Sequence, residues 1–330
     1  MLWTIRHLVG PLIFGLCAFI TPVRAESDCA PPAVSRATLH RLDVISDYRP
    51  SFKLCLNTQG ERFVALREMT AAGSDLLLLV DPTALTTRLS RAACWTCETA
   101  DEAALTPTRL MRAINSAAAS KGVERRTFLD GAGLNHGAGP GIYVTGDLCP
   151  SPRPLERDFL RSLEARGPHT PVALSISGLW LLKHYEDFRW ILDERDRGAL
   201  DVLWVDHSYH HPYRKGAPAD ETFMLTPGLN ADAEILQTER LLIANGETPS
   251  LFFRFPGLIS TSPLMQAVRR LHLVSLGADA WLALGKRASP GSIVLVHPNG
   301  NEPEGLRLFA RAMDKGALPT PFEALVEAPR

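Results

Sequence analysis

Three of the ten histidines of this chain lie within four residues, in the segment WVDHSYHHPY (204–213). His207 and His211 are four positions apart, and His210 directly precedes the second of them. Imidazole nitrogens are common ligands of zinc and related divalent ions, so this spacing is compatible with a metal site. A polar loop rich in histidine is the other interpretation. The choice depends on whether other parts of the chain bring polar groups to the same place.

Six short apolar runs with β-branched residues are predicted to be strands. They are GIYVTGD (141–147), PVALSIS (171–177), DVLWVDH (201–207), SLFFRFP (250–256), LHLVSLGAD (271–279) and SIVLVH (292–297). Amphipathic segments such as 154–167 and 232–246 lie between them and are predicted to be helices, the second ending at a glycine suited to a helix C-terminus. Strands that alternate with helices predict an α/β fold with a parallel sheet, either a barrel or an open doubly wound sheet.

Polar side chains stand at or just beyond the ends of five of these predicted strands. They are Asp147, His207, Arg254, Asp279 and His297. In parallel α/β folds the carboxyl ends of the strands meet at one edge, and active sites are built there. The sequence therefore predicts that these five side chains converge on one site.

The composition restricts the class of protein. Of 330 residues, 45% are hydrophobic and 22% are charged, which is typical of a globular protein with ample material for a core. The net charge is −1, so no charge excess favours binding to nucleic acid or to an anionic membrane surface.

The N-terminus is predicted to be a signal peptide over residues 1–25. A short basic region (6–7) precedes an apolar stretch of 13 residues (8–20) and a small-residue exit, VRA (23–25). A helix needs about 20 apolar residues to cross a bilayer, so we expect no membrane span in the mature chain and a secreted or periplasmic protein. An uncleaved N-terminal anchor is the alternative.

Five cysteines remain after cleavage, at positions 29, 55, 94, 97 and 149. In an oxidising compartment we expect structural disulfides, either between Cys94 and Cys97 or between these residues and Cys29 or Cys55. The motif CWTC (94–97) could also indicate a redox protein, but it follows a segment with no strand-to-helix pattern.

Residues 26–140 form an N-terminal extension whose role the sequence does not define. DLLLLVDP (75–82) is predicted to be a buried strand, and 107–122 a helix that starts at a proline. The glycine-rich stretch 129–141 is predicted to be a loop, and it lacks the spacing of a nucleotide-binding fingerprint.

From residue 142 to about 322 the chain resembles the polysaccharide deacetylases of carbohydrate esterase family 4, the NodB-homology domain. HSYHHP (207–212) resembles the family's His-Ser/Thr-x-x-His-Pro motif, RFPGL (254–258) its Arg-x-Pro motif, DAW (279–281) its Asp-x-Trp motif, and LVH (295–297) its Leu-x-His motif. The resemblance implies a distorted (β/α) barrel over 141–330. It also implies a divalent metal, usually zinc, bound by His207 and His211.

The family's first motif, Thr-Phe-Asp-Asp-Gly-Pro, is altered to TGDLCP (145–150). Asp147 matches the family's base, but Leu148 stands where the second aspartate binds the metal, and leucine has no ligand atom. Asp206 or Asp147 could replace the missing ligand, or the metal could keep an additional water molecule.

The resemblance also implies roles for the other residues. Asp147 is the expected base, paired with Arg254, and His297 is the expected proton donor, held and kept charged by Asp279. The backbone N–H of Gly257 is the expected oxyanion donor. Trp281 and Leu295 are expected to form an apolar wall around the acetyl group.

The sequence thus predicts a metal-dependent hydrolase that acts on carbon–nitrogen bonds other than peptide bonds. Its substrate would be an acetylated polysaccharide or oligosaccharide, with N-acetyl groups favoured over O-acetyl groups. Two other hypotheses remain: a carbohydrate-binding relative that has lost catalysis with the aspartate, and a thiol redox protein.

Overall fold

A computed structural model describes residues 29–32 and 42–330 of the chain. The predicted signal peptide (1–25) lies outside these residues. Among the described residues, no helix combines the length and the apolar character needed to cross a membrane.

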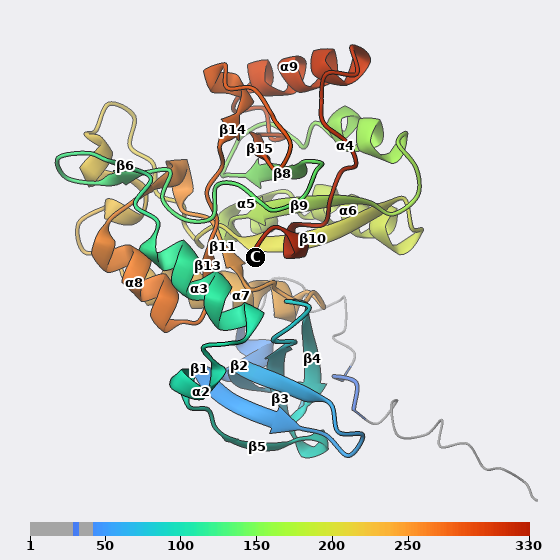
Figure 1. Cartoon of the computed structure of the whole chain (residues 1–330), viewed down its shortest axis with the longest axis vertical. Helices are drawn as coiled ribbons and strands as arrows, with labels where there is room; N and C mark the ends of the chain where they lie inside the picture. Colours follow the sequence, from blue (N-terminus) through green and yellow to red (C-terminus); the bar gives the residue numbers. More distant parts are fainter. Residues whose placement is uncertain (1–28, 33–41) are drawn as a thin grey trace, which may run out of the picture.

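A parallel sheet of seven strands forms the centre of the molecule, in the order β13-β11-β10-β9-β8-β15-β14 (Figure 1). The strands are β8 (Tyr143–Leu148), β9 (Thr170–Ile176), β10 (Leu200–Asp206), β11 (Phe252–Phe253), β13 (Val274–Ser275), β14 (Ala280–Trp281) and β15 (Ile293–Val296). All six predicted strands are present, and β14 is an additional one. The sheet curls into an incomplete barrel with β13 and β14 at its two edges, which confirms the predicted fold class.

Six helices of this part of the chain connect the strands or cover the sheet. They are α4 (Arg157–Glu164), α5 (Gly178–Lys183), α6 (Tyr185–Asp196), α7 (Ala231–Ala244), α8 (Ser262–Arg270) and α9 (Pro303–Asp314). The predicted helices 154–167 and 232–246 correspond to α4 and α7. Asn230 caps the start of α7 by accepting a hydrogen bond from the backbone N–H of Ala233, and Gly246 follows its end with φ +81°.

The alternation of side chains along the strands separates two cores. Even-numbered residues of β8, such as Val144 and Leu148, pack in one core with α4, α5, α6 and α9. Odd-numbered residues of β8, β9 and β15, such as Tyr143, Ala173 and Leu295, face the other side and pack with α3 (Arg109–Ala119). Because successive side chains on a strand point to opposite faces, Asp147 shares the second face with Thr145.

Residues 45–99 form a separate antiparallel sheet of five strands, in the order β4-β3-β2-β1-β5. The strands are β1 (Ile45–Leu56), β2 (Arg62–Ala71), β3 (Ser74–Val80), β4 (Thr87–Arg91) and β5 (Thr96–Thr99), and the predicted strand 75–82 corresponds to β3. The short helix α2 (Glu102–Leu105) and then α3 follow, and α3 confirms the predicted helix 107–122. A third sheet of three two-residue strands contains β6 (Val123–Glu124), β7 (Leu129–Asp130) and β12 (Ile259–Ser260).

Short 3-10 helices occupy several turns. They are η2 (Leu42–Val44), η3 (Ala92–Cys94), η4 (Ala219–Glu221), η5 (Phe223–Leu225), η6 (Pro256–Leu258), η7 (Leu282–Leu284) and η8 (Leu325–Glu327).

Two disulfides join the N-terminal sheet to itself and to the segment before it. Cys29 is bonded to Cys94, and Cys55 on β1 is bonded to Cys97, its partner across the β1–β5 ladder. The pairing of Cys94 with Cys97 is therefore not formed, and the CWTC motif has no dithiol to serve a redox reaction. Cys149 is a free, buried cysteine.

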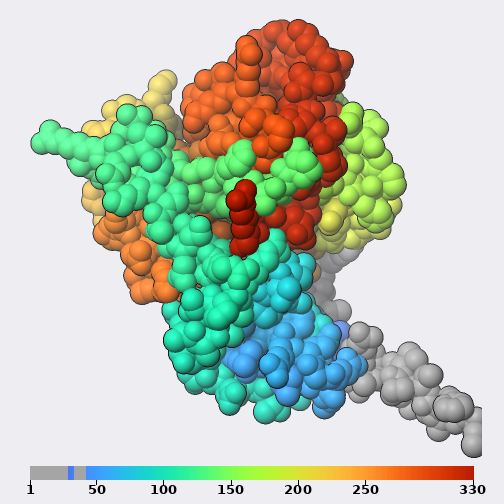
Figure 2. Space-filling view, viewed as in Figure 1, coloured from blue at the N-terminus to red at the C-terminus, as the bar shows by residue number. Residues whose placement is uncertain are grey.

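The N-terminal sheet packs directly on the parallel-sheet part (Figures 1 and 2). Ile45 and Leu78 share an apolar cluster with Ile243 and Ala244 at the end of α7. Beside them Arg67 of β2 pairs with Glu239 of α7 through two hydrogen bonds of 2.7 and 2.8 Å, and both side chains are fully buried. Separating the two parts of the chain would leave one of these charges buried without its partner, which is energetically costly. The ion pair therefore holds the N-terminal sheet against α7.

Candidate active site

Four of the five predicted strand-end residues come together at the carboxyl edge of the parallel sheet. Asp147 lies near the end of β8, and His207, Arg254 and His297 directly follow β10, β11 and β15. Asp147 contacts the other three, as the ion pairs below show. The fifth residue, Asp279, lies elsewhere.

Asp147 and Arg254 form a buried ion pair. The guanidinium Nη1 of Arg254 donates to Oδ1 of Asp147 at 2.7 Å and to Oγ1 of Thr145 at 2.7 Å, and its Nη2 donates to the carbonyl oxygen of Gly277 at 2.9 Å. Burial raises the pKa of Asp147, but the charges of Arg254, His207 and His297 outweigh burial and lower it to about 2. Asp147 is therefore an ionised carboxylate, which confirms the predicted pairing.

The histidine loop holds His207 in one tautomer. Nδ1 of His207 lies 2.9 Å from the carbonyl oxygen of Arg254, which can only accept, so Nδ1 carries the proton. Nε2 then faces the site, 3.6 Å from Oδ2 of Asp147. A backbone carbonyl that fixes a histidine in this way is the usual support for a metal ligand.

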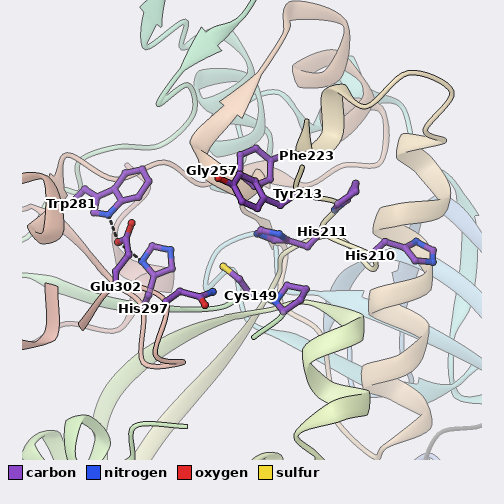
Figure 3. A pocket seen from close by; sticks show the side chains of 12 residues that line it. Cys149, His210, His211, Tyr213, Phe223, Gly257, Trp281, His297 and Glu302 are labelled. Carbon is purple, nitrogen blue, oxygen red and sulfur yellow. Dashed lines mark hydrogen bonds and ion pairs between the residues drawn. The ribbon is translucent and has the colours of Figure 1, made fainter. Parts of the chain in front are cut away.

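His210 points away from His211 (Figure 3) and contacts Glu234 of α7. Its Nδ1 and its backbone N–H contact the carboxylate of Glu234 at 2.6 and 2.8 Å. The hydroxyl of Ser208 donates to the same carboxylate. Glu234 thus anchors the loop from α7, while Nε2 of His211 is buried in the site with no hydrogen-bond partner among the described residues.

Cys149 completes this cluster, and sequence analysis did not identify it as a site residue. Its Sγ lies 3.5 Å from Nε2 of His207. The ligand atoms of Cys149, His207 and His211 all lie within 4.8 Å of one another, and all three residues are buried. Cys149 shares a strand face with Asp147 because the two are separated by one residue, which is a signal that the sequence already contained.

Leu148, which occupies the position of the family's metal-binding aspartate, is fully buried in the core with α4 and α5. Asp206, the suggested substitute, is not in the cluster, and its Oδ1 accepts the backbone N–H of Ser208. Burial raises the pKa of Cys149, but the neighbouring His211 and His207 lower it well below its usual value. A thiolate and two imidazoles are a donor set that suits zinc or a similar divalent ion, so these residues fit the metal that the resemblance implies.

The predicted partner of His297 is wrong. Strand β14 pairs with β15 so that Ala280 lies opposite Val294, which places Asp279 level with Ile293. His297 is four residues further along, or about 13 Å at 3.3 Å per residue. Asp279 instead accepts hydrogen bonds from the backbone N–H of Ile293 at 2.9 Å, from Ser292 at 3.1 Å and from Nδ1 of His136 at 2.7 Å.

Glu302, which immediately precedes α9, occupies the place expected for Asp279. Its Oε2 lies 2.8 Å from Nδ1 of His297 and accepts a hydrogen bond of 2.8 Å from Nε1 of Trp281 (Figure 3). The Nδ1–H of His297 is not well aligned with the oxygen in this conformation, so we describe the contact as an ion pair. Burial lowers the pKa of His297, but Cys149, Glu302 and Asp147 outweigh burial and raise it to about 10.

These groups open into a cavity of about 680 Å³. Its lining residues are Cys149, Pro150, His210, His211, Pro212, Tyr213, Phe223, Gly257, Trp281, His297, Asn301 and Glu302 (Figure 3). Gly257 and Trp281 therefore lie where substrate-binding residues were predicted. Leu295 does not, because it precedes His297 by two residues on β15 and is buried one layer deeper in the core.

Gly257 has a structural reason to lack a side chain. It has φ +63°, and a Cβ atom there would lie 2.5 Å from the ring of Phe223. Phe223 in turn stacks on Tyr213, with ring centres 5.3 Å apart, and Tyr213 is 63% exposed at the rim of the cavity. The loop after His211 thus supplies an aromatic edge on one side of the cavity, and Trp281 supplies one on the other.

No protein-family model matches the chain. Solved structures similar to it include family 4 carbohydrate esterases, the polysaccharide deacetylases, one of them a pseudoenzyme. A family 4 carbohydrate esterase from Bacillus anthracis is 17% identical, with 59% of this chain and 86% of that chain covered and a TM-score of 0.43. A peptidoglycan N-acetylglucosamine deacetylase is 19% identical, with 58% of this chain and 89% of that chain covered and a TM-score of 0.40. A family 4 pseudoenzyme from Bacillus anthracis is 16% identical, with 61% of this chain and 70% of that chain covered and a TM-score of 0.41.

Proposed function

We propose that this protein removes acetyl groups from a carbohydrate by hydrolysis at the cavity beside His297, with a divalent metal held by Cys149, His207 and His211. One observation carries the proposal: an ionised carboxylate, a histidine paired with a second carboxylate, and a buried cluster of three ligand atoms meet at one end of the sheet. These are the parts that acyl hydrolysis with the help of a metal requires.

The metal, when bound, polarises an acetyl carbonyl and makes a water molecule more acidic. The residues of the chain do the rest. Oδ2 of Asp147, which Arg254 does not engage, faces His207 and His297 and is placed to accept a proton from the attacking water. Arg254 keeps this carboxylate ionised and in place.

His297 stands at the cavity wall as the proton donor for the leaving group. An amine leaves only after it is protonated, whereas many alkoxides depart more readily. A histidine that lies between the carboxylates of Asp147 and Glu302 is favoured in its charged form and suits an amine. This supports N-acetyl groups as the substrate, and hence the cleavage of a carbon–nitrogen bond that is not a peptide bond.

The cavity and the disulfides support two further parts of the proposal. Exposed Tyr213 and half-buried Trp281 flank the cavity, where aromatic rings can pack on sugar rings of an oligosaccharide or polysaccharide. Two disulfides support an oxidising location, in agreement with the predicted signal peptide and a secreted or periplasmic protein.

Acetate release tests the proposal. Purified protein loaded with zinc is incubated with N-acetylated oligosaccharides and, separately, with O-acetylated ones. We expect faster release from the N-acetylated set, and a loss of at least about 100-fold in Asp147→Asn, which keeps the shape but not the base. Binding of acetylated oligosaccharides without release, by protein shown to contain its metal, would favour the alternative that the change at Leu148 left a binding protein.

A further inference from the structure

We propose that Glu302 is the positioning residue for His297, in the role predicted for Asp279 from the sequence; this rests on the proposed function. Glu302 comes from the segment between β15 and α9 and not from a strand end. Glu302, five residues after His297, would then orient the proton donor, and Asp279 would have only a structural role.

The imidazole of His297 lies between two carboxylates. Nδ1 is 2.8 Å from Oε2 of Glu302, and Nε2 is 4.0 Å from Oδ2 of Asp147. A carboxylate on Nδ1 fixes which edge of the ring faces the reaction, because the other nitrogen must then point into the site. Glu302 therefore directs Nε2 toward Asp147, where the leaving group would be protonated.

Glu302 also connects the proton donor to the cavity wall. Its Oε2 accepts the indole N–H of Trp281 as well as contacting His297, and the two rings lie 5.7 Å apart at 34°. Trp281 is half-buried and lines the cavity. One carboxylate oxygen thus sets the positions of Trp281 and of the proton donor His297. A sugar packed against Trp281 is therefore held at a fixed position relative to Nε2 of His297.

The carboxylate of Asp279 accepts hydrogen bonds at a different level of the sheet from His297. Three donors from the start of β15 and from the 129–141 loop converge on it. Its carboxylate ties that loop to the sheet through His136, and it is level with Ile293 and not with His297.

The test compares two substrates in Glu302→Gln, which keeps the size of the side chain and an acceptor for Trp281. On an N-acetylated oligosaccharide, whose amine must be protonated, we expect kcat to fall by about 10–100-fold with KM within about twofold. On 4-nitrophenyl acetate, whose leaving group needs no proton, we expect a change of less than about threefold. Glu304→Gln, which changes an exposed glutamate paired with Arg307 on the same helix, is the matched control and should alter neither.

Equal losses on both substrates, or no loss on either, would overturn the inference. A second measurement separates this result from failure of the proposed function. In protein labelled with 15N-histidine, the Nδ1–H of His297, kept from exchange with water by the contact with Glu302, should give a proton signal that is absent in Glu302→Gln and in His297→Gln and present in Asp279→Asn. If metal-loaded wild-type protein releases no acetate from either substrate, the proposed function fails, and a signal lost in Asp279→Asn but kept in Glu302→Gln would overturn the inference independently.

Discussion

The sulfur of Cys149 lies 3.5 Å from Nε2 of His207, on the strand face that also carries Asp147. The sequence departs from the family that it resembles at the neighbouring position, where Leu148 stands in place of a metal-binding aspartate, and Leu148 points into the opposite core. The ligand that the motif lacks at one position is available at the next, from a side chain of different chemistry. Metal binding at this site therefore depends on the thiolate of Cys149.

The anchor of the histidine loop should control metal affinity. Glu234→Gln removes the charge that accepts hydrogen bonds from Ser208 and His210, so we expect His211 to lose its fixed position. Loss of such a supporting contact typically weakens metal binding by about 10–100-fold. Competition with a chelator of known affinity measures the change. Asp232→Asn, an exposed change on the same helix, should leave affinity unaltered, and equal affinities in both variants would show that the anchor has no such role.

Arg254 should be required for stability as well as for activity. Arg254→Met leaves the buried carboxylate of Asp147 without its main partner, and breaking a buried pair in this way costs about 3–5 kcal/mol. Urea unfolding followed by circular dichroism gives the difference. The double variant with Asp147→Asn should recover part of the loss, since the unpaired charge is then absent. If the double variant is as unstable as the sum of both single variants, the two side chains are not coupled.

The N-terminal sheet should unfold together with the parallel-sheet part. Arg67→Met leaves the buried carboxylate of Glu239 with the hydroxyl of Tyr48 but without its cationic partner, and it also removes a hydrogen bond to the carbonyl oxygen of Leu271. We expect a loss of about 3–5 kcal/mol in the free energy of unfolding. Arg125→Met breaks an exposed pair with Asp130 and should cost less than about 1 kcal/mol. Two separate unfolding transitions, with only the first moved by Arg67→Met, would contradict this coupling.

Acid should act on the contact between α2 and the end of α8. Hydrogen bonds from Arg269 and His272 lower the pKa of Glu102, and burial lowers the pKa of His272. A carboxyl with a lowered pKa stabilises the fold above its unfolded pKa of about 4.5, and that stability is lost as the pH falls through the folded pKa. Glu102→Gln should therefore melt at a lower temperature than the wild type at pH 7, and the gap should close as the pH approaches 3. A gap independent of pH would assign the effect to packing.

The position of the site was predictable because it depends on strand order and side-chain alternation, both of which leave patterns in the sequence. Asp147, His207, Arg254 and His297 each end a strand of clear apolar pattern. Asp279 was misplaced because the predicted strand 271–279 contains only the two residues of β13, and a second strand, β14, begins directly after Asp279. The expected end of one strand is in fact the start of the next.

Glu302 and the disulfides depended on contacts that the sequence does not encode locally. Glu302 lies in a polar turn, and its contact with His297 follows from how the chain turns into α9. Cys55 meets Cys97 only because β1 and β5 pair across 42 residues. Cys149 was the fifth of an odd number of cysteines and two positions after the predicted base, Asp147, which together were sufficient to propose it as a ligand.

Cobalt(II) titration of the purified protein without the predicted signal peptide (1–25) tests the central claim most directly. A thiolate ligand produces an intense charge-transfer absorption in the near ultraviolet, which histidine and carboxylate ligands do not, and the four other cysteines of the described chain are held in disulfides. We predict that this band appears, saturates at one cobalt per chain, and is absent in Cys149→Ser. Stoichiometric cobalt binding without the band, or the same band in Cys149→Ser, would contradict the assignment of Cys149 as the third ligand.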